Sequence, residues 1–98
     1  MSKLHLYDII KRPVITEKSV ELAEMHNQYV FEVDMSANKI QIAEAVFKIF
    51  EVDVLDVRTM VMPAKRGQRG RKKYTRRSAW KKAIVTLPPG QSIAEFTM

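Results

Sequence analysis

One segment limits what this chain can fold into: residues 58–82 contain eleven Lys or Arg and no acid. Like charges at this density repel one another, so the stretch at residues 63–79 within this segment is too charged to fold on itself, and the core must come from the rest of the chain. Residues 1–57 carry ten acids against six bases, and residues 83–98 carry a single acid. The sequence therefore divides into a near-neutral to acidic body and one basic segment. The cations of the segment are Arg58, Lys65, Arg66, Arg69, Arg71, Lys72, Lys73, Arg76, Arg77, Lys81 and Lys82.

Two helices are predicted in the body. Thr16 can cap a helix over residues 17–25, with Glu17 favourably placed in the first turn. Ser36 or Asn38 can cap a second helix that runs to Phe50 and has apolar residues at helical spacing. We expect this apolar stripe to pack into the core. Its members are Ile40, Ala43, Val46, Phe47, Ile49 and Phe50.

Three strands are predicted as well. Residues 27–34 alternate in the period of a half-buried strand, with Tyr29, Phe31 and Val33 on one face. Residues 52–61 suit a second strand whose alternation slips near Leu55-Asp56, as a bulge would cause. Residues 83–87 form a third, closed by a turn over residues 88–90. Residues 1–12 are expected to form a short N-terminal segment that is helical or irregular.

This order of elements predicts an α+β fold in which a largely antiparallel sheet packs against helices in two layers. The length of 98 residues fits one domain over residues 1–98. The last two strands are consecutive and should pair as a hairpin. Residues 63–79 then form a basic connection of about 17 residues, far beyond the usual 2–5 of hairpin loops, and connections this long are usually functional or disordered. The fold therefore includes a long basic hairpin extension.

Several function classes find no support in the residues. The chain has no cysteine, which excludes disulfides and thiolate metal sites, and no apolar run long enough for a secretion signal or membrane span. His5 and His26 stand apart, with no motif pairing either to a nucleophile or a metal ligand. Gly67 and Gly70 lack the strand-to-helix setting of a phosphate-binding loop. We expect a cytoplasmic protein that is not an enzyme and has no cofactor, metal, membrane or small-molecule substrate.

The basic segment indicates nucleic-acid binding. Each Lys or Arg placed against a phosphate releases condensed counterions, so the segment can supply salt-dependent affinity without help from the fold. Tyr74 and Trp80 lie among the cations, and either can stack on an unpaired base. A solvated charged face, a nuclear-localisation tract and a free-standing DNA-binding or nucleoid protein are the alternatives. The position of the segment between two strands, rather than at a terminus, favours nucleic-acid binding over a solvated tail.

The sequence also resembles the family of bacterial-type large-subunit ribosomal protein twenty-three over nearly its full length. The order and spacing of several blocks carry the resemblance. These blocks are residues 10–19 (IKRPVITEKS), 29–34 (YVFEVD), 37–42 (ANKIQI) with Ala45-Val46, 50–52 (FEV), 57–60 (VRTM) and 80–87 (WKKAIVTL).

The resemblance implies a ribosomal constituent that binds large-subunit ribosomal RNA, lies beside the exit of the nascent-chain tunnel and contacts neighbouring large-subunit ribosomal proteins. It also implies a docking surface for trigger factor and the signal recognition particle, with Glu17 and Glu51 at the matching acidic positions. The residues leave open whether the ribosome is cytoplasmic or organellar. With the body cations added, the expected RNA-binding residues are Arg12, Lys18, Lys39, Arg58, Lys65, Arg66, Arg69, Arg71, Lys72, Lys73, Tyr74, Arg76, Arg77, Trp80, Lys81 and Lys82.

Overall fold

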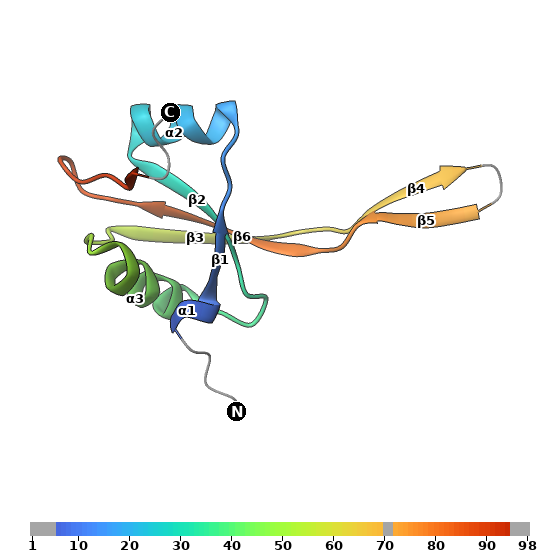
Figure 1. The fold of residues 1–98 in the computed structure, drawn as a ribbon, viewed down its shortest axis with the longest axis horizontal. Coiled ribbons are helices and arrows are strands. Elements are labelled where there is room, and N and C mark those ends of the chain that lie inside the picture. The colour runs from blue at the N-terminus through green and yellow to red at the C-terminus, as the bar shows by residue number, and fades with distance from the viewer. Residues whose placement is uncertain (1–5, 70–71, 95–98) are drawn as a thin grey trace.

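The computed structural model describes residues 6–69 and 72–94, with side chains described for residues 7–64 and 78–94. The elements follow in the order α1 (Leu6–Ile9), β1 (Ile10–Pro13), α2 (Glu17–His26), β2 (Gln28–Val33), α3 (Lys39–Phe50), β3 (Asp56–Met62), β4 (Lys65–Arg69), β5 (Lys72–Arg77) and β6 (Trp80–Thr86). Figure 1 shows the β4–β5 hairpin projecting from a body in which strands lie between α2 and α3. The predicted α+β fold is confirmed.

The body is built on a four-stranded sheet in the order β1-β2-β6-β3, and every neighbouring pair is antiparallel. The three predicted strands are all present, and β3 and β6 pair as the predicted hairpin. Strand β1 was missed, because residues 10–13 were expected to be helical or irregular. Pro13 ends β1 opposite Phe31 at the edge of the sheet, where a residue without a backbone N–H is tolerated.

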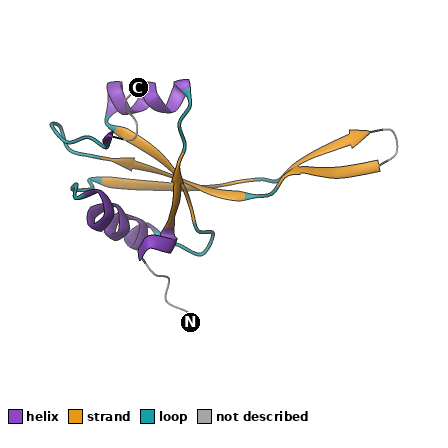
Figure 2. Cartoon of the chain, viewed as in Figure 1, coloured by secondary structure: helices purple, strands orange, loops and turns teal. Residues whose placement is uncertain are grey.

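The core lies between one face of the sheet and α3. The predicted inward residues Tyr29, Phe31 and Val33 are all buried. Val85 and Ala83 of β6 extend the same buried face, and Figure 2 shows α3 alongside these strands. The rings of Phe31 and Phe50 lie 5.4 Å apart between centroids, within the range of favourable aromatic pairs.

The predicted core stripe of α3 was partly wrong in phase. Ile42, Ala45 and Val46 form the buried face, whereas Ile40 is 78% exposed and Phe47 is 50% exposed. The helix is apolar at so many positions that two stripes satisfy the spacing of residues three and four apart, and periodicity alone does not choose between them. Ala43, Ile49 and Phe50 are partly buried at the margin of the core.

Local hydrogen bonds fix both ends of the two longer helices. Thr16 caps α2 as predicted: its hydroxyl accepts from the Ser19 amide at 3.1 Å, and the Ser19 hydroxyl accepts from the Thr16 amide at 2.7 Å. Asn38, rather than Ser36, caps α3 through the same kind of reciprocal pair with Gln41. Asn27 follows α2 in the left-handed conformation that commonly ends helices.

The second predicted strand begins later than expected. Strand β3 starts at Asp56, and its register with β6 runs without a shift from Asp56↔Thr86 to Met62↔Trp80. The slip near Leu55-Asp56 therefore marks the start of the strand, and the predicted bulge was wrong. Residues 52–55 precede the strand, where Gln91 exchanges hydrogen bonds of 2.7 and 3.0 Å with Asp53. These bonds hold the segment after β6 beside the entry to β3.

The basic hairpin, which we define as β4, β5 and the residues between them, continues the β3–β6 pair outward. Pairing in the body ends at Met62↔Trp80 and resumes at Lys65↔Arg77, with Pro63 in the interruption. The expectation that the basic segment is too charged to fold on itself was wrong for these strands. Pairing of β4 with β5 uses main-chain groups and requires no buried side chain. Residues 70–71 lie outside the described part of the chain.

Candidate nucleic-acid interface

A groove of about 410 Å³ opens on the body near the root of the basic hairpin. It brings together residues from β1, α2, β2 and β6 that are far apart in sequence. Three of its lining residues are cations, and none is an acid. The lining residues are Arg12, Val14, Ile15, Thr16, Lys18, Ser19, Leu22, Val30, Trp80 and Lys82. Four of the predicted RNA-binding residues therefore share one concave surface.

Sheet register explains how Arg12 and Lys82 come to the same face. Arg12 pairs with Glu32, and Glu32 pairs with Lys82, so their side chains form a row across three strands. The Arg12 guanidinium donates from Nε to Oε1 of Glu32 at 3.0 Å, and the Arg12 side chain remains 57% exposed. This contact uses one of the five N–H donors of the arginine and orients the guanidinium beside the groove.

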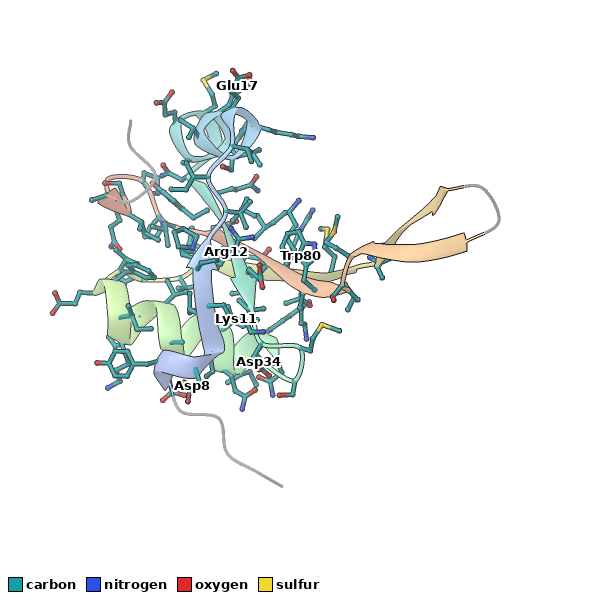
Figure 3. The ribbon with its side chains drawn as sticks, turned by 45° about the vertical axis from the view of Figure 1, so that its right-hand side comes forward. Asp8, Lys11, Arg12, Glu17, Asp34 and Trp80 are labelled. Carbon is teal, nitrogen blue, oxygen red and sulfur yellow. The ribbon has the colours of Figure 1, made fainter. Side chains whose placement is uncertain are left out.

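Trp80 lines the groove as the first residue of β6, which begins three residues earlier than predicted. It lies two positions before Lys82, so the two side chains share a face of β6. Trp80 is half-buried, so part of its side chain is open to solvent. In Figure 3 it lies where β6 leaves the body toward the basic hairpin, with Arg12 on the neighbouring part of the body.

Most of the other predicted RNA-binding residues lie on β3 or on the basic hairpin. Arg58 is exposed on the edge strand β3 and pairs with Ile84, which places it on the same face of the sheet as Lys82. Arg71 lies outside the described residues. The others belong to the basic hairpin, where the structure describes the backbone but no side chains: Lys65, Arg66 and Arg69 on β4, and Lys72, Lys73, Tyr74, Arg76 and Arg77 on β5.

Two further predicted RNA-binding residues of the body, Lys81 and Lys39, also lie away from the groove. Lys81 alternates with Trp80 and Lys82 and therefore points to the opposite face, where its Nζ donates to the carbonyl oxygen of Ala37 at 2.5 Å. Lys39 is the first residue of α3 and lines a separate shallow pocket with Leu55 and Val57. The contact of Lys81 gives that lysine a structural role in holding the loop before α3.

An acidic residue of that loop has a perturbed titration. The Asp34 carboxylate accepts from the hydroxyl and the amide of Ser36 at 2.5 and 2.9 Å. These two hydrogen bonds, with smaller contributions from the charges of Lys11 and Lys81, lower the pKa of Asp34 below its usual value. Asp34 therefore remains ionised close to the lysine that holds the loop.

The two predicted docking acids are not brought side by side. Glu17 is exposed in the first turn of α2, and Glu51 is exposed as the residue that ends α3. In Figure 1 the two helices lie on either side of the strands. A factor that touches both residues must therefore contact a broad surface of the body.

Within the described residues, no cluster of three His, Cys, Asp or Glu is placed to hold a metal ion. Among the helices described here, none has the length and apolar content needed to cross a membrane.

Comparison with known proteins identifies the family. A family model described as Ribosomal protein L23 matches residues 8–95 of this chain. The large ribosomal subunit protein uL23 of Desulfatibacillum aliphaticivorans is 52% identical over 93 residues, which cover 95% of this chain and 97% of that protein. This chain belongs to the ribosomal protein L23 family. The uL23 proteins of Geobacter sulfurreducens and Aggregatibacter actinomycetemcomitans are each 48% identical over 95% of this chain, covering 98% and 92% of those proteins.

Family membership confirms the resemblance that the sequence blocks indicated. L23 proteins are constituents of the ribosome and not enzymes, which agrees with the sequence prediction. The apolar lining of the groove was missed, however. Val14, Leu22 and Val30 carry no sequence pattern that distinguishes them from ordinary core residues, and only the fold places them beside Arg12 and Trp80.

Proposed function

We propose that this protein is a structural constituent of the large ribosomal subunit that binds large-subunit ribosomal RNA through one basic surface. This surface runs from the groove and Arg58 onto the basic hairpin. The observation that carries the proposal is continuity: β3 and β6 lead directly into β4 and β5, so the cations of the hairpin adjoin those of the body. The names of the uL23 relatives support the assignment to the large subunit.

The basic hairpin supplies most of the electrostatic attraction in this proposal. An extended pair of strands can follow an RNA backbone or enter a space between RNA helices that the wider body cannot enter. The molecule measures 53 Å along its longest axis and 18 Å along its shortest, which suits such a role. Binding through many phosphates should weaken steeply as salt rises, because each neutralised phosphate releases counterions.

The experiment replaces residues 64–78 by an Asn-Gly turn and measures affinity for large-subunit ribosomal RNA over a range of salt concentrations. We expect a large loss of affinity and a shallower dependence on salt. The matched control is Lys48→Ala, which removes an exposed cation of α3 outside the proposed surface and should leave affinity nearly unchanged. A shortened chain that binds as tightly as the parent at moderate salt would contradict the proposal.

A second role as a docking platform is proposed for Glu17 and Glu51, with trigger factor and the signal recognition particle as partners. The observation that favours it is the conformation of Glu51, which ends α3 with φ 56° although glycine is less strained there. The carboxylate at that position is exposed at the end of the helix, where a partner can reach it. Both acids lie outside the basic segment, so docking and RNA binding should be separable.

Charge reversal tests the docking role. Single exposed acids contribute little, about 1 kcal/mol or less, so Glu17→Ala alone should be mild. The double change Glu17→Lys with Glu51→Lys should leave subunit assembly intact and weaken trigger factor recruitment, with a defect that shrinks as salt rises. Unchanged recruitment at low salt would rule out these two residues as the docking site.

A further inference from the structure

The groove beside Trp80 combines three properties that a phosphate-binding surface alone does not need. It is concave, it is partly apolar, and an indole ring forms part of its lining. Its volume of about 410 Å³ falls within the range of small-molecule sites, roughly 300–1,000 Å³. The space is therefore suited to one nucleotide and far too small to admit a nucleic-acid duplex.

We propose that this groove binds one unpaired nucleotide of RNA, with its base against Trp80 and its flanking phosphates at Arg12, Lys18 and Lys82. The proposal rests on the RNA-binding function proposed above and names the ligand of one part of that surface.

The base position follows from the apolar lining. Val30 forms part of the lining and is only 2% exposed, and Leu22 of α2 is half-buried beside it. Aromatic side chains next to apolar surface are the usual platform for a base that has left its helix. Bases inside a duplex are already stacked on their neighbours, so only an unpaired base can use this site.

The phosphate positions follow from the cations at the rim. Arg12 and Lys18 are exposed, and Lys82 is half-buried on the strand beside Glu32. The Glu32 carboxylate binds Arg12 at Nε, so the outer edge of the guanidinium is oriented by this contact and can meet a phosphate. Three cations and one neighbouring acid give the site a net positive charge. This charge favours binding of an anionic nucleotide over binding of a basic peptide.

The groove should bind different bases with similar affinity. Its two hydroxyls both belong to the capping box of α2, where Ser19 Oγ donates to the Thr16 carbonyl at 3.0 Å and accepts from the Thr16 amide. Thr16 Oγ1 accepts from the Ser19 amide in the same motif. Stacking, rather than reading of base edges, therefore dominates recognition.

Trp80 is the single tryptophan of the chain, so its fluorescence reports on the groove directly. The probe is a single-stranded RNA decanucleotide of mixed sequence, compared with a duplex of the same sequence. We expect saturable quenching of Trp80 emission by the single strand and little quenching by the duplex. Binding of the labelled RNA is followed independently by fluorescence anisotropy.

Two substitutions separate stacking from packing. Trp80→Leu should lower affinity for the single strand at least fivefold, the factor that corresponds to about 1 kcal/mol of stacking. Trp80→Phe keeps an aromatic face and should bind within about threefold of the parent, a range of less than 1 kcal/mol. Thermal unfolding confirms that both variants fold, and Lys48→Ala serves as the control for general charge effects.

The outcomes distinguish this inference from the proposed function. RNA binding by anisotropy with unchanged Trp80 emission and equal affinity of Trp80→Leu would overturn the nucleotide site and leave RNA binding intact. No RNA binding at low salt would overturn both. In assembled subunits, a photo-crosslinking residue at Ile15, which lines the groove, should attach to ribosomal RNA. Attachment only to protein would show a protein occupant and overturn the inference.

Discussion

Glu51 ends α3 in the left-handed region, with φ 56° and ψ 42°. A residue with a Cβ is strained there, whereas glycine is not. Glu51→Gly should therefore raise the free energy of unfolding by about 0.5–1 kcal/mol, after allowance for the greater flexibility of glycine in the unfolded chain. Chemical denaturation measures this change. A less stable variant would mean that the Glu51 side chain makes a larger contribution to the fold than its exposure indicates.

Asp34 gives the fold a contribution that depends on pH. Its folded pKa lies below the ordinary value of 3.8, because the carboxylate accepts two hydrogen bonds from Ser36. The stabilisation is therefore present above the ordinary value and is lost as pH falls through the lowered folded value. Ser36→Ala removes the hydroxyl and keeps the amide, so the pKa of Asp34 should rise part of the way. An NMR titration of the Asp34 carboxyl that gave the same pKa in both proteins would contradict this origin.

At the scale of elements, local chemistry was easier to predict than packing. Thr16 was recognised as a helix cap because a capping interaction joins residues three apart, and the turn at residues 88–90 was recognised from its prolines and glycine. The turn has the expected form: Gln91 donates to the Pro88 carbonyl at 3.3 Å, and Gly90 has φ 89°. Strand β1 and the buried face of α3 depend on distant partners, so the sequence alone did not determine them.

The phase of α3 can be tested by a matched pair of substitutions. Ile42 is fully buried, and Ile42→Ala should cost about 2–4 kcal/mol of stability through lost burial and a residual cavity. Ile40 is 78% exposed two positions earlier on the same helix, and Ile40→Ala should change stability by about 0.5 kcal/mol or less. Denaturation midpoints of the two variants give the answer. Equal losses of stability in the two variants would contradict the packing of the Ile42 face of α3 against the sheet.

The body should fold without the basic hairpin. Its four-stranded sheet is complete between β1 and β3, and the pair Met62↔Trp80 ends the ladder before the hairpin begins. Replacing residues 64–78 by an Asn-Gly turn leaves a four-residue connection, one of the common hairpin lengths. The shortened chain should unfold cooperatively, as followed by circular dichroism. Loss of the cooperative transition would show that the hairpin supports the body.

At the scale of the whole molecule, both the charge and the shape divide the protein into a body and the basic hairpin. The radius of gyration is 15.2 Å, against about 13 Å for a compact domain of this length, and the basic hairpin accounts for the extension in Figure 1. The concentration of cations was visible in the sequence, because they are consecutive. The groove was not, because Arg12, Lys18 and Lys82 meet only once β1, α2 and β6 are packed together.

The central claim is that this member of the L23 family is held in the large subunit by RNA contacts of its basic surface. The most direct measurement expresses a tagged full-length chain in bacterial cells and sediments the large subunits through a high-salt cushion. Affinity for isolated RNA should fall as salt rises. In an assembled subunit, however, many contacts must break together before the chain can leave, so it should remain with the large subunit in near-stoichiometric amount. A chain that is washed off completely, or that sediments with DNA instead, would contradict the claim and favour a free-standing nucleic-acid-binding protein.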